Sequence, residues 1–199
     1  SLASRMAYTL MNEILPHVDY AIDYHTGSAS RSNYPQIRCV FDREENLQLA
    51  RAFEAPFIIN SAYRNASFRW AASKRKIPVL VYEGGESLRL DQSAIEIGVL
   101  GYKNVLSALG MLSDQHQPKK ESVSLQKSTW VRARSSGIFR LAVKAGQFVK
   151  KGTILGSIHS PYSDFEKKVR NKHEGYIIAI NHQAVINQGD ALLHVAYND

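Results

Sequence analysis

Two side chains, His25 and Glu83, have the types that metal binding and acid–base catalysis require, and each follows a strand-like segment. His25 ends the alternating segment 17–25, and Glu83 follows the apolar run 77–82 and precedes two glycines. Glycines at a strand end let the backbone approach a ligand closely. An imidazole can ligate a metal, and a carboxylate can act as a general base. Two structural alternatives stay open: a capping or hydrogen-bonded histidine, and a glutamate in an ion pair or a helix cap.

Other side chains offer weaker candidates for chemistry. Glu86 competes with Glu83 for the role of general base, although a solvated turn suits it better. Arg64 and Arg69 are candidates for bidentate binding of a substrate carboxylate, with a solvated helix face as the alternative. Cys39 lies in a strand-like run and is interpreted as a buried thiol. The sequence contains neither a G-x-S-x-G elbow nor a phosphate-binding glycine-rich loop.

The elements that must position these side chains alternate between strands and helices over residues 1–112. Periodicity predicts helices at 1–14, 42–55, 64–74 and 91–111, and strands at 17–25, 36–41 and 77–82. Asp42 is predicted to cap the second helix, with Glu45 at the capping-box spacing. This alternation favours an α/β sheet, a fold class that places active sites at the carboxyl ends of its strands.

The second half of the chain has a different sequence pattern. Residues 113–128 are polar and without periodicity, which predicts a linker between a domain at 1–112 and one at 129–199. Beyond the linker, short strand-like runs are separated by glycine and proline, and no helix is expected. Segments 137–158 and 175–195 repeat one pattern, with Gly137 and Gly152 in the places of Gly175 and Gly189. The repeat predicts a small all-β sandwich with internal two-fold symmetry.

Composition excludes some protein classes. The 199-residue chain has a single cysteine, which excludes an internal disulfide framework, and no apolar run near the ~20 residues of a membrane helix. The net charge of +7 alone suggests nucleic-acid binding. However, residues 1–112 carry 12 basic and 11 acidic residues, against 13 and 7 in the rest. The excess therefore lies away from His25 and Glu83, and we expect solvated strand edges rather than a nucleic-acid or membrane partner.

Four short motifs occur in a fixed order: Asp23-Tyr-His25-Thr-Gly27, Pro35-Gln-Ile-Arg38, Tyr82-Glu83-Gly-Gly-Glu86 and Gly101-Tyr-Lys-Asn104. With them, residues 1–112 resemble the succinylglutamate desuccinylase/aspartoacylase family of zinc hydrolases. The resemblance implies a zinc-carboxypeptidase-like α/β domain, His25 as a zinc ligand and Glu83 as the catalytic glutamate. It makes Asp23 a candidate partner of His25 in the second coordination shell. It also implies one zinc ion, an N-acyl amino acid or a similar anionic amide as substrate, and a cytoplasmic location.

The chain departs from this family at the metal. In the family, an H-x-x-E pair supplies the first two zinc ligands, and none of the seven histidines here has a glutamate three residues later. A catalytic zinc usually has three protein ligands. The chain also opens within a predicted helix and without a methionine. Either the chain is a C-terminal fragment whose missing ligands lie upstream of Ser1, or the metal site of the family has been lost. The predicted helix at the start favours the fragment, which we expect to be inactive by itself.

The β-rich region resembles both the C-terminal domain of that family and the barrel-sandwich hybrid of biotinyl and lipoyl carriers. Gln147-Phe-Val-Lys-Lys-Gly152 and Gln188-Gly-Asp190-Ala-Leu-Leu carry this resemblance. The alternative function is therefore a non-catalytic binding or carrier-like module, with a modifiable lysine within residues 167–172. A lid or a surface for homo-oligomer formation is the structural interpretation of the same region.

Overall fold

The computed structural model describes residues 1–113 and 120–198. Residues 114–119 of the predicted linker lie outside the described residues. The first half contains the elements α1 (Leu2–Thr9), a π-helical turn (Leu10–Ile14), a 3-10 turn (Leu15–His17), β1 (Ala21–Gly27), β2 (Arg31–Cys39), α2 (Glu44–Phe53), β3 (Phe57–Asn60), α3 (Phe68–Lys74), β4 (Val79–Glu86) and α4 (Gln92–Ala108). The predicted helices and the α/β alternation are confirmed. None of the described helices is long and apolar enough to cross a membrane.

The described residues after α4 form strands and no helix, as predicted. These strands are β5 (Val123–Leu125), β6 (Lys127–Arg132), β7 (Gly137–Leu141), β8 (Phe148–Val149), β9 (Ile154–His159), β10 (Glu166–Arg170), β11 (Gly175–Asn181), β12 (Val185–Ile186) and β13 (Ala191–Tyr197). In the two segments of the predicted repeat, β7-β8-β9 and β11-β12-β13 both run long, short, long. The halves exchange their short strands: β8 pairs with β11, and β12 pairs with β7.

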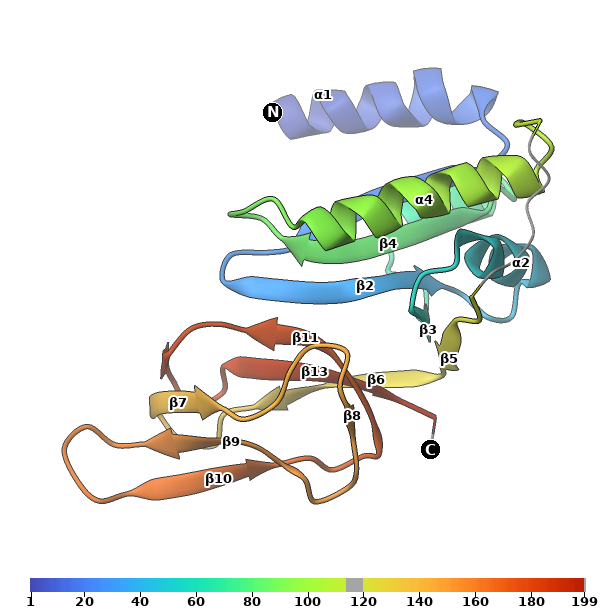
Figure 1. Ribbon diagram of the computed structural model, residues 1–199. Helices are drawn as coiled ribbons and strands as arrows, with labels where there is room; N and C mark the ends of the chain where they lie inside the picture. The colour runs from blue at the N-terminus through green and yellow to red at the C-terminus, as the bar shows by residue number, and fades with distance from the viewer. Residues whose placement is uncertain (114–119, 199) are drawn as a thin grey trace.

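One sheet runs through both halves of the chain (Figure 1). Its order is β1-β4-β2-β11-β13-β6, with β1 parallel to β4 and β2 antiparallel to both β4 and β11. A second sheet of order β10-β9-β7-β12 covers one face of the β-rich half. The described strands form open sheets and no closed barrel. The domain boundaries stay a prediction; within the predicted linker, β5 pairs in parallel with β3.

The apolar core that supports the first half lies between the sheet and the helices α2 and α4. Phe53 of α2 is 1% exposed and stacks on the Tyr82 ring of β4, with ring centroids 5.2 Å apart. A Cβ on Gly101 of α4 would lie 2.2 Å from the Phe53 ring, so glycine allows the helix to approach this closely. Tyr82 and Tyr24 donate hydrogen bonds to the α4 carbonyls of Ala94 and Gly98. The tyrosines of β1 and β4 therefore fix these strands against α4.

Two local predictions were wrong. Arg43 rather than Asp42 is the N-cap of α2, and its side chain makes no capping hydrogen bond. The chain reaches the helix through an extended residue 43, one position later than the capping-box spacing assumes. Strand β4 continues to Glu86, so Glu83 lies within a strand and not after it. The strand continues because β4 has partners on both sides, with Glu83 opposite His25 of β1 and Gln36 of β2.

Candidate functional site

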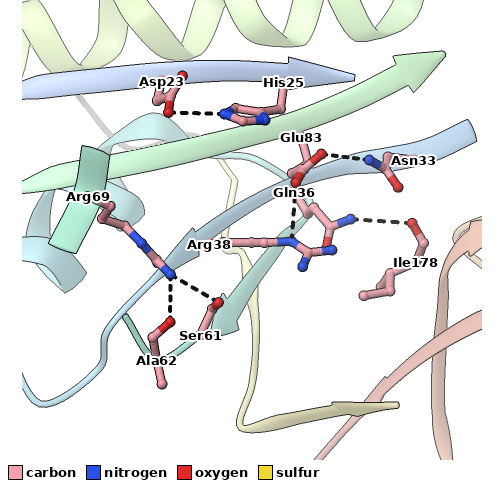
Figure 2. A network of polar contacts seen from close by, with 10 residues as sticks. All are labelled: Asp23, His25, Asn33, Gln36, Arg38, Ser61, Ala62, Arg69, Glu83 and Ile178. Carbon is pink, nitrogen blue, oxygen red and sulfur yellow. Dashed lines mark hydrogen bonds and ion pairs between the residues drawn. The ribbon is translucent and has the colours of Figure 1, made fainter. Parts of the chain in front are cut away.

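Strand pairing brings His25 and Glu83 together. They are register partners in the parallel β1–β4 pair. Alternation along β1 puts Asp23 on the same face as His25, whereas the intervening Tyr24 points to α4. Figure 2 shows Asp23, His25 and Glu83 on neighbouring strands, with the side chains of β2 beside them. The sequence-predicted general base and metal ligand thus lie on adjacent strands.

Glu83 is held by two side chains of β2. Asn33 Nδ2 donates a hydrogen bond to Glu83 Oε2 at 2.7 Å, and Arg38 Nε lies 3.8 Å from Glu83 Oε1 in an ion pair (Figure 2). The Asn33 contact orients one carboxylate oxygen. The Arg38 distance is too long for a hydrogen bond, so Oε1 keeps the capacity to accept a proton. Asn33 was missed from the sequence, and Arg38 was visible only as part of the motif Pro35-Gln-Ile-Arg38.

His25 contacts Asp23: its Nε2 atom lies 3.0 Å from Asp23 Oδ2. Both side chains are partly open to solvent, 50% for His25 and 34% for Asp23. No group of three histidine, cysteine, aspartate or glutamate side chains in the described part of the chain has a geometry that could hold a metal. The residues present therefore do not by themselves fit a catalytic zinc.

Two arginines, Arg38 and Arg69, lie in a partly buried setting, and Arg38 pairs with Glu83. Arg69 of α3 donates from Nη2 to Ser61 Oγ at 3.2 Å and to the Ala62 carbonyl at 2.9 Å (Figure 2). Its Nη1, like Arg38 Nε, has no hydrogen-bond partner. Burial lowers the pKa of both guanidinium groups, and the positive charge of Arg38 lowers the pKa of Arg69 further. An anion between them would satisfy the unpaired donors and offset this repulsion.

The other sequence candidates lie elsewhere. Arg64 is exposed in the turn before α3, where its carbonyl accepts a hydrogen bond from Ser67. Glu86 pairs with Arg89, and this hydrogen bond is the main cause that lowers the pKa of Glu86. Glu86 and Arg89 line an apolar cavity of about 510 Å³ beside α4, which His25 also lines and Glu83 does not. Cys39 is buried, and this burial raises the pKa of its thiol to about 12.

The β-rich half packs against β2, the strand that supports Glu83, and sequence reasoning missed this contact. Gln36 of β2 donates to the Ile178 carbonyl of β11 at 3.4 Å. His194 of β13 is 5% exposed and stacks on Trp130 of β6, with ring centroids 4.4 Å apart. Burial, and secondarily the charge of Arg38, lower the pKa of His194 to about 3. His194 is therefore neutral at physiological pH. His194 lies close to Arg38 because β11, the neighbour of β13, pairs with β2. This pairing joins segments about 150 residues apart in the sequence.

The low pKa of His194 predicts that the folded state loses stability as the pH falls. Its pKa is depressed on folding, so between pH 6.5 and 3 the unfolded state binds a proton that the folded state does not. Stability is therefore lost as pH falls, by about 1.4 kcal/mol per unit below 6.5. Between pH 7.5 and 5.0, we expect the free energy of unfolding in urea to fall about 2 kcal/mol more in the wild type than in His194→Phe.

The matched control is His17→Phe, because His17 is an exposed histidine outside the strands. This variant should keep the acid sensitivity of the wild type. Equal pH dependence in the wild type and His194→Phe would contradict a neutral buried imidazole.

Comparisons with known proteins agree with the geometry. The family model for the succinylglutamate desuccinylase/aspartoacylase catalytic domain matches residues 1–109. No curated protein matches the chain. Among solved structures, a succinylglutamate desuccinylase/aspartoacylase from Rhodobacter sphaeroides is 22% identical with a TM-score of 0.86, covering 100% of this chain and 64% of its own. The apo ectoine utilization protein EutE (DoeB) from Ruegeria pomeroyi is 20% identical with a TM-score of 0.89, covering 100% and 66%.

Because the sequence identities are low, these structural matches establish the fold alone. An aspartoacylase family protein from Mesorhizobium loti adds a third match, with 18% identity, a TM-score of 0.79 and coverage of 100% and 69%. The chain spans just under two thirds of the length of the Rhodobacter and Ruegeria proteins. The matches extend over the β-rich half as well as over residues 1–109.

Proposed function

Because the chain belongs to the succinylglutamate desuccinylase/aspartoacylase family, we propose that it is part of a hydrolase that removes the acyl group from an N-acyl amino acid or a related small amide. The observation that carries this proposal is the placement of Glu83 opposite His25, with Asn33 orienting its carboxylate. A carboxylate held on one oxygen and open on the other is suited to acid–base catalysis.

In this proposal Glu83 moves the protons of amide hydrolysis. Its carboxylate accepts a proton from the attacking water and then donates a proton to the leaving amine nitrogen. Asn33 fixes Oε2, so Oε1 is the oxygen that takes the proton. Arg38 places a positive charge 3.8 Å from Oε1. Both supporting side chains come from β2, whose pairing with β4 therefore sets the position of the base.

We propose that the complete site holds one zinc ion with His25 as one of its ligands and Asp23 as the partner of that histidine. Zinc acts in amide hydrolysis as a Lewis acid on the scissile carbonyl. The described residues lack a ligand set for it. The two other ligands then belong to a longer protein that includes this chain, and the 199-residue chain by itself is inactive. We refer to that longer protein as the full-length protein.

The substrate in this proposal carries a negative charge. Arg69 Nη1 and Arg38 Nε are buried donors without hydrogen-bond partners, although Arg38 Nε is in an ion pair with Glu83, and a substrate carboxylate would satisfy them. Arg64 stays a weaker candidate for the same role, because its exposed side chain gains less from an ion pair. N-acyl amino acids supply both an amide bond and a carboxylate, so they are the substrate class that suits these groups.

We propose a barrel-sandwich-hybrid-like arrangement for the β-rich half, supported by the exchange of β8 and β12 between the repeats. In this arrangement, the β-rich half closes one side of the site through Trp130 and His194. The alternative carrier-like function requires a modifiable lysine on an exposed hairpin turn. Lys167 and Lys168 lie instead within β10, paired with β9, whereas Lys172 is exposed in the connection between β10 and β11 and stays the candidate for such a modification.

The experiment that tests the proposal incubates the full-length protein with a panel of N-acetyl and N-succinyl amino acids and measures the amine released. We expect hydrolysis of at least one anionic member and none by the 199-residue chain. Arg69→Gln should raise KM with kcat little changed, because it removes binding rather than proton transfer. Absence of hydrolysis across the panel would overturn the substrate class, and full activity of the 199-residue chain would overturn the shared site.

A further inference from the structure

A second concave site lies in the β-rich half, away from Glu83 and His25. The basic slot, as we name it, is a cavity of about 630 Å³ between residues 129–134, on and after β6, and residues 167–173, on and after β10. Six cationic side chains line it: Arg132, Arg134, Lys167, Lys168, Arg170 and Lys172. No aspartate or glutamate is among its lining residues. Within the described chain, none of these six cations has an ion-pair partner.

The slot is bounded by two sheet edges. Strand β6 ends the larger sheet and pairs only with β13, and β10 ends the smaller sheet and pairs only with β9, among the described strands. Figure 1 shows both strands in the lower, β-rich part of the molecule. An edge strand presents backbone N–H and C=O groups that another extended segment can pair with.

The floor of the slot is apolar. Ile158 is fully buried, and Val131 and Val169 are partly buried and pack against the core of the β-rich half. The slot therefore combines a floor of aliphatic side chains with a rim of positive charge. An occupant with alternating apolar and acidic side chains would fill the floor with one set and pair the rim with the other, since successive side chains of a strand point to opposite sides.

Lysines on edge strands also prevent unwanted strand pairing, and this is the simplest explanation of the charge. Two arginines go beyond that explanation, because their guanidinium groups are held in place. Arg132 Nη1 donates to the Gly189 carbonyl at 2.9 Å, and Arg170 Nη1 donates to the Gly152 carbonyl at 3.0 Å. Fixed cations around a concave apolar floor are typical of a recognition site, where less side-chain entropy is lost on binding.

The same surroundings disfavour single-stranded nucleic acid. Binding of that kind uses aromatic rings on which bases stack. The Trp130 ring is already stacked on His194, and the His173 ring is stacked on Tyr197 at 4.1 Å between ring centroids. The free strand edges, in contrast, offer hydrogen bonds that suit a polypeptide backbone.

We propose that the basic slot binds an extended segment of a partner protein in which acidic and apolar residues alternate. The segment adds a strand at the free edges of β6 and β10. Its apolar side chains contact Val131 and Val169, and its carboxylates pair with the arginines and lysines of the rim. This site is independent of the proposed hydrolase activity, because it shares neither Glu83 nor His25.

The test uses a fluorescein-labelled peptide, Glu-Val-Glu-Val-Glu-Val-Glu, titrated with the 199-residue chain at low salt and followed by fluorescence polarisation. We expect saturable binding that weakens as salt rises. Charge reversal by Arg134→Glu with Lys168→Glu should weaken binding about tenfold or more. The matched control is Lys144→Glu with Lys150→Glu, two charges of the same half outside the slot, which should leave the affinity nearly unchanged.

Four further arms identify the occupant. A Lys-Val peptide should not bind, and a Glu-Ser peptide should bind much more weakly, because it lacks side chains for the apolar floor. Pyrophosphate and a single-stranded oligonucleotide should compete poorly. The proposal would be overturned by absence of binding to the Glu-Val peptide, by equal binding of the Glu-Ser peptide, or by stronger binding of either anion. It would also be overturned by self-association of the chain through the slot, detected by sedimentation and abolished by the Arg134/Lys168 charge reversal.

Discussion

Replacing Glu83 by glutamine in the full-length protein is expected to lower kcat about 10²- to 10⁴-fold, the range typical of a lost general acid–base catalyst. The amide keeps the size of the side chain and can still contact Asn33, whose side chain lies 2.7 Å from Glu83 Oε2. It can no longer accept the proton of the attacking water. The loss should therefore fall on kcat, with KM changed little.

The measurement is steady-state hydrolysis of the best substrate of the N-acyl amino acid panel. The matched control is Glu86→Gln, because Glu86 lies three residues away on the same strand and pairs with Arg89 instead of facing Arg38. This control should retain most of the activity. Equal losses in both variants would indicate damage to β4 and not removal of the base.

The second large effect concerns the support of the site strands. Phe53→Ala is expected to lower the free energy of unfolding by about 3–5 kcal/mol, because it removes a side chain that is 1% exposed and stacked on Tyr82. Tyr82 precedes Glu83 on β4, and Gly101 leaves no Cβ that could fill the space. A loss of this size is a large part of the stability of an ordinary domain.

Urea unfolding of the 199-residue chain at neutral pH measures this effect. Phe165→Ala is the matched control, because Phe165 is 43% exposed in the connection between β9 and β10. The control should cost about 1 kcal/mol or less. Similar losses in the two variants would show that the Phe53–Tyr82 contact does not support the sheet.

The sequence predicted those parts of the fold that depend on local pattern. Periodicity identified α2 and α4, and the apolar run before Glu83 identified β4. The four-residue strand β3 was missed, because a run as short as Phe57–Asn60 has no diagnostic period. The Asp42 cap was wrong by one residue, which is the usual precision of a helix boundary.

The site was only half predictable for a different reason. His25 and Glu83 stood out because each follows a strand-like run, and their register brings them together. Asn33 reaches Glu83 through an irregularity in the β2–β4 register between Asn33 and Gln36, which no local pattern encodes. His194 enters through strand pairing between the two halves of the chain. The positions of Asn33 and His194 depend on strand pairing between distant segments and not on the residues next to them in the sequence.

The zinc content of the purified full-length protein tests the central claim most directly, because the claim assigns one ligand to this chain and the others to residues outside it. Measured by atomic emission after dialysis, it should be about one zinc per chain in the wild type and close to zero in both His25→Ala and the isolated 199-residue chain. Glu83→Gln should keep its zinc, since Glu83 is assigned to proton transfer. A full equivalent of zinc in His25→Ala, or in the isolated chain, would contradict the account.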